Sequence, residues 1–437
     1  MLATLLPLMI YGCSRDSDEL TVAVVAPLSG ENASSGVKAV EGARLAAESL
    51  AAREAMGGRK IRIVSRDERK ANPASLLSDL VRRDRPVAVI GLSSSAVVSA
   101  SGPLAREGIP ALVIWGSAGK LDVKAPVLRL GPSNAALSER VSRWLVTARG
   151  LKRVAIAASS DEKGSDGAKA VSRAVSRLHG DVVASVSIDP DALDMTTVAQ
   201  GLQSSGADAL VIWAPPRAAA RLCLAVRAIG WDVQIAGSDD LVDPEFRVLA
   251  GGSSDGVALA LPDISPQRWL GPALRDWLGD YHRRFTVLPI ADQRTLVTAL
   301  PYSAITAYDA VNAVADAARR AGKKGDIRAE LAKTKSFDGV LNDYRFVSRE
   351  AFEVEDLRIS RFYNFSLLSD VDEGADVAEQ IAFYKVQVSG FFLSDEYLES
   401  EEGRELSERV LEDVLNDPDS VDFFKPYRHP LPAPGKI

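Results

Sequence analysis

Residues 20–26 read Leu-Thr-Val-Ala-Val-Val-Ala, and residues 27–30 follow at once with Pro-Leu-Ser-Gly. An almost uninterrupted apolar run that ends in turn-forming residues predicts a strand buried on both faces. The pattern next predicts an apolar-faced helix over residues 37–55 and a second short strand over residues 60–64. Strands that alternate with helices in this way form parallel sheets with helices on both faces.

The alternation continues with a helix predicted over residues 73–83, a strand over 86–91, a helix ending near Glu107 and a strand over 109–114. In such sheets ligands bind beyond the carboxyl ends of the strands. The residues that follow these predicted strands share a small hydroxyl side chain; they are Ser29, Ser94, Ser95 and Ser117. We therefore expect a rim that forms hydrogen bonds to a ligand and that contains no acid, base or metal ligand.

Four motifs, in order along the chain, resemble one known family. They are Pro-Leu-Ser-Gly at 27–30 with Gly-Ala-Arg-Leu-Ala at 42–46, Val89 to Ser95 with Gly-Ile-Pro at 108–110, Tyr-Asp-Ala-Val at 308–311, and Phe-Asp-Gly-Val at 337–340. The chain is similar in these motifs, over about residues 20–395, to the type I periplasmic-binding-protein family. The similarity is to its branched-chain amino acid receptor group, the substrate-binding proteins of ABC importers.

The resemblance implies an α/β fold of two doubly wound, Rossmann-like lobes joined by three hinge crossings, near residues 131, 262 and 350. A second alternating run, with strands near 154–157, 182–186, 209–213, 234–237 and 256–260, supports a second lobe. The domains predicted are 1–19 as signal peptide and linker, 20–131 plus 262–350 as lobe 1, 132–261 plus 351–395 as lobe 2, and 396–437 as an extension. A strand near 380–388 is expected to complete the fold, and residues 164–167 are expected to form a loop.

The extension combines an amphipathic helix over residues 396–415 with a tail of four prolines over 426–437. One interpretation is a helix packed on the outside of a lobe, and the other is an arm that docks on a partner.

Composition excludes several classes of protein. The 437-residue chain has a net charge of −7 and no long basic block, which argues against a nucleic-acid partner. Its three histidines lie in separate segments, away from metal or triad spacing. Residues 116–120 read Gly-Ser-Ala-Gly-Lys but lack the first glycine and the hydroxyl of a phosphate loop. The sequence therefore predicts no metal, no cofactor and no enzymatic activity.

The amino terminus predicts export. An apolar run over residues 2–10 is too short to span a bilayer but suits a signal peptide. Residues 10–13, Ile-Tyr-Gly-Cys, resemble a lipobox, which predicts lipidation of Cys13 and cleavage before it. No basic residue precedes the run and Tyr11 is bulky, so a frayed apolar terminus is the alternative. If Cys13 is lipidated, Cys223 is the remaining thiol, and its helical apolar surroundings predict burial.

The resemblance also implies a ligand site. In the receptor group, side-chain hydroxyls and backbone N–H groups hold the ligand carboxylate, and these positions fall on Ser95, Ser117 and the backbone of Trp115. The acid that pairs with the ligand ammonium falls on Asp239. Trp115 replaces an alanine of the family and reduces the expected volume of the pocket.

Two further positions depart from the family pattern. Lys163 stands where the family has a tyrosine, and Pro215 stands where it has a second-lobe aromatic. Lys163 either receives a polar group of the ligand or is a solvated loop lysine. The acid pair Asp239-Asp240 is not matched by a second convincing acid in the same lobe, and Tyr302 is assigned to the core.

These observations predict a periplasmic, membrane-anchored, monomeric lipoprotein that binds a small polar ligand, an amino acid or a related metabolite, between its lobes. Its partners are the ligand and the permease subunits of an ABC importer, and it touches the membrane through a lipid anchor only. The alternative function is a ligand-sensing or assembly lipoprotein with the same fold and no transport role. An enzyme, with only Asp239 and Lys163 as candidate catalytic residues, is the third hypothesis.

Overall fold

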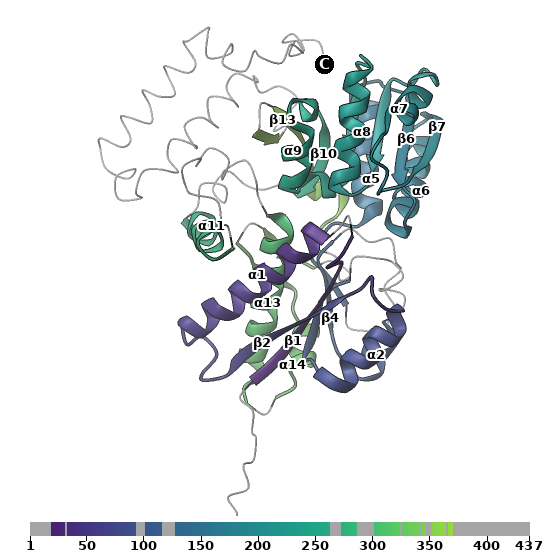
Figure 1. The fold of residues 1–437 in the computed structure, drawn as a ribbon. Coiled ribbons are helices and arrows are strands. Elements are labelled where there is room, and N and C mark those ends of the chain that lie inside the picture. Colours follow the sequence, from purple (N-terminus) through teal and green to yellow (C-terminus); the bar gives the residue numbers. More distant parts are fainter. Residues whose placement is uncertain are drawn as a thin grey trace, which may run out of the picture.

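The computed structural model describes residues 19–30, 33–92, 101–115, 127–262, 272–285, 301–323, 325–340, 342–346, 351–363 and 366–369. Within these ranges the chain forms two α/β lobes arranged one above the other (Figure 1). Lobe 1 contains the amino-terminal sheet and lies below lobe 2 in that view.

The sheet of lobe 1 is five-stranded and entirely parallel, in the order β2-β1-β3-β4-β5. Its strands are β1 (Glu19–Ala26), β2 (Lys60–Asp67), β3 (Ala88–Gly91), β4 (Ala111–Val113) and β5 (Val127–Arg129). In β1 every side chain from Val22 to Ala26 is fully buried. The apolar run that opens the fold is therefore a strand covered on both faces, as predicted.

Helices cover both faces of this sheet. On one face Val22 and Val24 pack with α1 (Ala33–Ala52), α11 (Pro272–Phe285) and α13 (Tyr302–Ala321). On the other face Ala23 and Val25 pack with α2 (Pro73–Asp84) and α4 (Gly102–Arg106). The alternation of β1 side chains between two apolar clusters follows from the period of two in a strand.

The contact between α1 and α13 is very close at Gly42. A Cβ atom built on Gly42 would lie 1.9 Å from the backbone oxygen of Ala304, which is far inside van der Waals contact. The glycine thus lets the two backbones approach, and it explains physically why this position of the 42–46 motif carries no side chain.

A small antiparallel sheet of β11 (Ser336–Asp338) and β12 (Asp343–Arg345) follows α14 (Ile327–Ala332). Asp309 of α13 holds the β11–β12 pair in place. Its Oδ1 accepts a hydrogen bond from the Val340 backbone N–H (2.8 Å), and its Oδ2 accepts one from the Tyr344 hydroxyl (3.0 Å). Asp309 is 1% exposed and Tyr344 is fully buried.

The sheet of lobe 2 is seven-stranded, in the order β14-β13-β10-β9-β8-β6-β7. Its strands are β6 (Arg153–Ser159), β7 (Asp181–Ile188), β8 (Ala209–Trp213), β9 (Gln234–Gly237), β10 (Ala258–Pro262), β13 (Leu357–Tyr363) and β14 (Ser366–Ser369). The first five are parallel, and β13 and β14 add to β10 in antiparallel fashion.

The other elements of lobe 2 are mainly helices. They are α5 (Asn134–Arg143) with a π-helical end (Trp144–Ala148), α6 (Glu162–Arg177), α7 (Thr196–Gln203), α8 (Pro216–Ala228), α9 (Pro244–Ala250), and the 3-10 turns η2 (Asp239–Val242), η3 (Gly251–Ser254) and η5 (Val354–Asp356). Cys223 of α8 is fully buried, as expected, and burial raises the pKa of its thiol to about 12.

The chain passes between the two sheets after β5, after β10 and before β13. The backbone N–H of Ala351, on the third crossing, donates to the carbonyl of Arg129 at 3.0 Å, so this crossing is tied to the end of β5. Two doubly wound lobes joined by three crossings are the fold that the sequence predicted.

One local expectation is contradicted, and one strand was missed. The loop expected at 164–167 is wrong, because α6 already begins at Glu162, where the Asp161 carboxylate caps the helix by accepting from the Gly164 N–H at 2.8 Å. The antiparallel strand β13 was not predicted. The expected strand at 380–388 and the extension at 396–437 lie outside the described residues, and the exact domain boundaries stay predictions.

Candidate functional site

The candidate site lies where the carboxyl ends of the parallel strands of the two lobes meet. On the lobe 2 side, Lys163 lies in the first turn of α6, just after β6, and Asp239 and Asp240 open η2, just after β9. These two strands flank β8 in the sheet, so sheet order brings the three side chains to one edge.

Lys163 and Asp240 form a close ion pair. The Lys163 Nζ lies 2.6 Å from Asp240 Oδ1, and the two side chains are only 14% and 11% exposed. Burial by itself lowers the pKa of Lys163, but Asp240, Asp239 and Asp161 together outweigh it, so the pKa is raised. The lysine therefore stays protonated, and it is held by a neighbouring acid instead of being solvated in a loop.

On the lobe 1 side, Trp115 follows β4 and Tyr302 begins α13. The indole Nε1 of Trp115 donates to Ser303 Oγ at 3.0 Å, and Asn342 Nδ2 donates to the Tyr302 hydroxyl at 3.4 Å. Both aromatic side chains are less than 9% exposed. They are thus fixed by hydrogen bonds within lobe 1.

Asp239 and Tyr302 connect the two sides of the site. Burial raises the pKa of the Tyr302 hydroxyl, the hydrogen bond from Asn342 lowers it, and the negative charges of Asp239 and Asp309 raise it further. Asp239, itself only 7% exposed, therefore lies close enough to act electrostatically across the junction. An acid of lobe 2 and an aromatic hydroxyl of lobe 1 share one neighbourhood.

Ser29 lies at a third strand end, after β1, and its hydroxyl group interacts with the Asp67 carboxylate of β2. Burial acts to raise the pKa of Asp67, but hydrogen bonds from the Ser29 hydroxyl and from the N–H groups of Leu28 and Arg69 lower it. The Leu28 N–H lies 3.1 Å from Asp67 Oδ1. The turn at 27–30 is therefore held to β2 by an ionised carboxylate.

A second contact between the lobes lies at the start of α1. Lys38 Nζ of lobe 1 lies 2.7 Å and 2.9 Å from the two carboxylate oxygens of Asp243 in lobe 2, and it also donates to Ser34 Oγ at 2.6 Å. Asp243 is 5% exposed and also caps α9 by accepting from the Glu245 N–H at 2.9 Å. We call this pair the interlobe ion pair.

The structure thus places Lys163 and Asp239 together, with Trp115 on the lobe 1 side and Ser29 at a separate strand end. Ser94, Ser95, Ser117 and Cys13 lie outside the described residues. No sequence pattern assigns a role to Asp240, and Tyr302 is expected in the core. Asp240 pairs with a lysine 77 positions earlier, which no sequence spacing reveals, and Tyr302 is indeed buried but beside Asp239.

Across the described ranges, no group of His, Cys, Asp and Glu side chains has an arrangement that could hold a metal ion. None of the helices in these ranges is both long enough and apolar enough to cross a membrane.

Two lobes whose strand ends face each other across polar residues define a class of hinged binding proteins. The chain belongs to the periplasmic binding protein family, whose model matches residues 19–362. The resemblance read from the sequence motifs is confirmed.

Individual relatives are distant. A protein of Pseudomonas aeruginosa described as an amino acid binding protein is 23% identical over 239 residues, which are 54% of this chain and 64% of that protein. The chain thus spans slightly less than two thirds of that curated relative.

Solved structures share the fold. LivJ of Streptococcus pneumoniae, a branched-chain amino acid transporter substrate-binding protein in complex with isoleucine, superposes with a TM-score of 0.65 at 20% identity, covering 80% of this chain and 99% of LivJ. A solute-binding protein of an ABC transporter from R. palustris, in complex with 4-hydroxybenzoate, gives a TM-score of 0.65 at 19% identity, covering 81% and 96%.

Proposed function

We propose that this chain is the extracytoplasmic solute-binding lipoprotein of an ABC importer. In this proposal it is anchored through a lipid on Cys13 and binds an amino acid or a related small polar metabolite between its lobes. Membership of the periplasmic binding protein family supports the class. The observation that carries the proposed site is the position of Asp239, which lies at the end of β9 beside the ion pair of Lys163 and Asp240 and is only 7% exposed.

The charges favour a ligand that carries an ammonium group. Lobe 2 contributes one lysine and three acids, Asp161, Asp239 and Asp240, to the neighbourhood of the site. Lys163 is paired with Asp240, and Asp239 lies beside this pair at the end of β9. Of the two solved structures above, LivJ holds isoleucine, which carries an ammonium group, and the R. palustris protein holds 4-hydroxybenzoate, which has no cationic group. We infer that an amino acid fits this chain better than an aromatic acid does.

The test is the variant Asp239→Asn, which keeps the shape of the side chain and removes its charge. Loss of a charge-assisted hydrogen bond to the ligand ammonium should weaken binding by about 1.5 kcal/mol or more, roughly tenfold in Kd. Isothermal titration with the amino acids that stabilise the wild-type chain in a thermal-shift screen measures this change.

The matched control is Asp181→Asn, because Asp181 is exposed at the amino end of β7, at the opposite edge of the sheet. It should bind like the wild type. If 4-hydroxybenzoate binds and no amino acid does, or if Asp239→Asn leaves the Kd unchanged, the assignment of Asp239 to the ammonium is wrong.

The interlobe ion pair gives a second prediction. The pair forms only when the lobes are this close, so it stabilises the same arrangement that a ligand held by both lobes requires. Lys38→Met removes the cation and leaves Asp243 buried, which should raise the Kd about fivefold without changing any ligand contact. Small-angle scattering of the ligand-free variant should show a larger radius of gyration than the wild type.

Lys70→Met provides the control, since Lys70 is 76% exposed and lies 3.9 Å from Asp67 within lobe 1. An unchanged Kd and an unchanged radius of gyration for Lys38→Met would mean that the ion pair does not favour the closed arrangement.

A further inference from the structure

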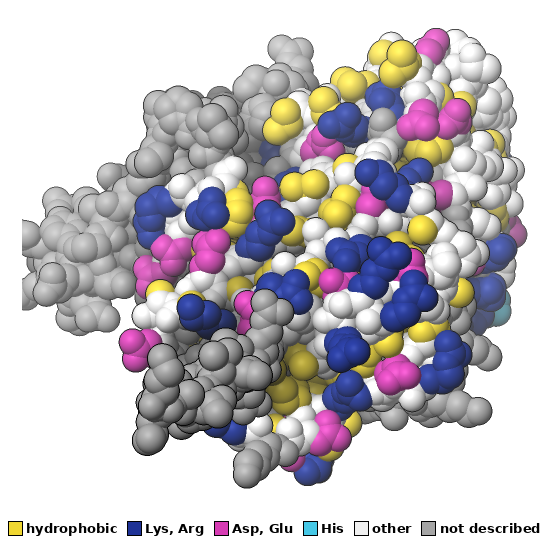
Figure 2. All heavy atoms as spheres, turned by 60° about the horizontal axis from the view of Figure 1, so that its bottom comes forward, with side chains coloured by type: hydrophobic (Ala, Val, Ile, Leu, Met, Phe, Trp, Pro, Cys, Tyr) yellow, Lys and Arg dark blue, Asp and Glu magenta, His cyan; other side chains and the backbone are white. Residues whose placement is uncertain are grey.

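The end of lobe 1 that lies away from lobe 2 carries an excess of positive charge. We define its basic face by six residues at the ends of three elements: Arg59, Lys60, Arg82, Arg83, Arg85 and Lys323. Figure 2 turns this end of the molecule forward and shows dark-blue Lys and Arg side chains gathered over it. The chain as a whole has a net charge of −7, so this face opposes the overall charge.

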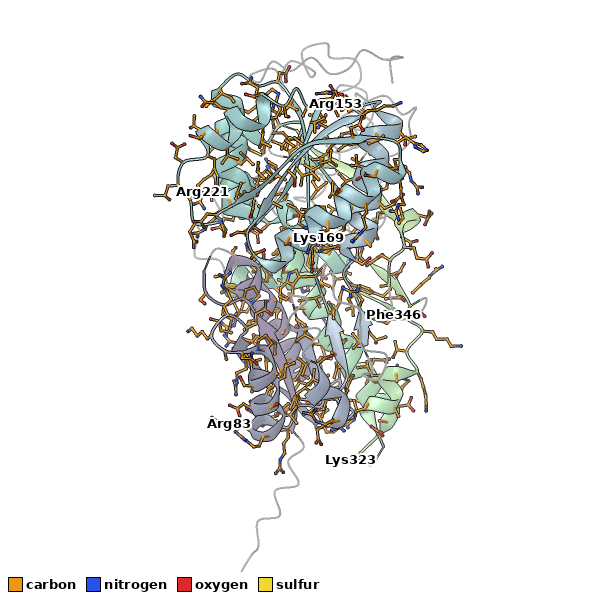
Figure 3. The ribbon with its side chains drawn as sticks, turned by 90° about the vertical axis from the view of Figure 1, so that its right-hand side faces the viewer. Arg83, Arg153, Lys169, Arg221, Lys323 and Phe346 are labelled. Atoms are coloured by element: carbon orange, nitrogen blue, oxygen red, sulfur yellow. The ribbon has the colours of Figure 1, made fainter. Side chains whose placement is uncertain are left out.

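Hydrogen bonds fix these elements side by side. Arg59, just before β2, donates to the carbonyls of Ala318 (2.6 Å) and Gly322 (3.2 Å), which brings the end of α13 to the start of β2. The Val87 N–H, between α2 and β3, donates to the carbonyl of Thr21 in β1 at 2.8 Å. The ends of α2 and α13 therefore flank the starts of the strands, and Figure 3 labels Arg83 and Lys323 at this foot of lobe 1.

The acids that form ion pairs at the ends of β1 and α2 do not cancel the excess. Glu19 pairs with Arg62 at 3.1 Å and Asp84 pairs with Arg66, and neither arginine belongs to the basic face. Asp79 pairs with Arg82 at 2.5 Å and with Arg83 at 3.8 Å, but both arginines remain about 70% exposed. Lys60, Arg85 and Lys323 are exposed as well.

Helix ends explain only part of this face. Basic residues in the last turn of a helix complement its dipole, which accounts for Arg82 and Arg83 in α2. Lys60 opens a strand and Arg85 and Lys323 lie beyond their helices, so helix stability alone does not account for them.

The face surrounds the place where the chain enters the fold. Glu19 opens β1, and its pairing with Arg62 puts this entry beside β2. Cys13 precedes Glu19 by six residues, a length of chain that reaches at most about 20 Å. A lipid on Cys13 would therefore hold the basic face within about 20 Å of the bilayer.

We propose that the basic face binds anionic phospholipid headgroups, so that lobe 1 rests on the membrane to which the lipid ties it. The proposal rests on the proposed function only through the lipid anchor at Cys13. Clustered Lys and Arg side chains at an anionic surface add to membrane binding residue by residue, and salt weakens them because it screens the charges. The face thus supplies a second membrane contact, in addition to the anchor.

The experiment uses the full chain with Cys13→Ser, which cannot be lipidated, and sedimentation with vesicles. We expect binding to vesicles with about 30% phosphatidylglycerol at about 0.05 M salt, loss of this binding at about 0.5 M salt, and no such salt-dependent binding to pure phosphatidylcholine. Adding Lys60→Glu, Arg83→Glu and Lys323→Glu should lower the partition coefficient about 100-fold, at about fivefold for each residue.

The matched control adds Lys152→Glu, Lys169→Glu and Arg173→Glu, three exposed residues of lobe 2, and should partition like the parent chain. If both triple variants lose vesicle binding equally, the loss depends only on the net charge of the chain, and the proposal is wrong. The proposal is also wrong if the chain binds anionic vesicles only after deletion of residues 396–437. In that case the acidic extension, and not a membrane, occupies the basic face. Ligand titration of the same variants, without vesicles, tests the proposed function separately.

Discussion

Replacing Asp309 by alanine is expected to lower the free energy of unfolding of lobe 1 by about 3 kcal/mol. The Asp309 carboxylate accepts from the Val340 N–H and the Tyr344 hydroxyl in a setting where the acid and the tyrosine are almost completely buried. Alanine would leave both donors without their acceptor, and a buried donor without an acceptor costs more than the bond itself contributes. Urea unfolding followed by circular dichroism measures the change.

Asp316→Ala is the control on the same helix, because its carboxylate is 38% exposed and pairs with Arg319 and Arg320 at the surface. A change of less than about 0.5 kcal/mol is expected there. If the two alanine variants unfold at the same urea concentration, Asp309 does not hold the β11–β12 sheet to α13.

The second large effect is expected for Gly42→Ala, with a loss of about 2 kcal/mol. The new methyl group would lie 1.9 Å from the backbone oxygen of Ala304, so α1 and α13 would have to move apart along their whole contact. Neither atom belongs to a flexible side chain that could turn aside. Thermal unfolding should show a lower Tm than the wild type.

Gly201→Ala is a control with the opposite expected sign. Gly201 lies on the exposed side of α7, and a Cβ atom built on it meets nothing within 4 Å. Alanine there should stabilise the chain by up to about 1 kcal/mol through helix propensity alone. The prediction fails if Gly42→Ala is as stable as Gly201→Ala.

Much of the fold could be predicted because its signals are local. The run at 20–26 is apolar because both faces of β1 are covered, and burial on both faces makes consecutive residues apolar. The strand β13 was missed because Leu357 and Ile359 alternate with Arg358 and Ser360, a pattern too short to distinguish from a loop. Its place as an antiparallel neighbour of β10 depends on pairing with residues about 100 positions earlier.

The site was less predictable than the fold. Asp239 and Lys163 were placed by their resemblance to family positions, and the structure brings them into one neighbourhood. The ion pair between Lys163 and Asp240 depends on the order of the strands, which puts β6 and β9 on either side of β8. Sequence spacing contains no such information, so the lysine could not be distinguished from a solvated one before the fold was known.

The close packing of α1 on α13 also bears on how the protein is made. The ribosome delivers α1 about 270 residues before α13, and the whole parallel sheet of lobe 2 is synthesised between them. Until α13 emerges, the part of α1 that packs on α13 stays uncovered, although the sheet of β1 and β2 already covers its other side. Apolar surface that stays uncovered during synthesis favours aggregation. We expect lobe 2, whose parallel strands are contiguous, to gain protease resistance during translation before lobe 1 does.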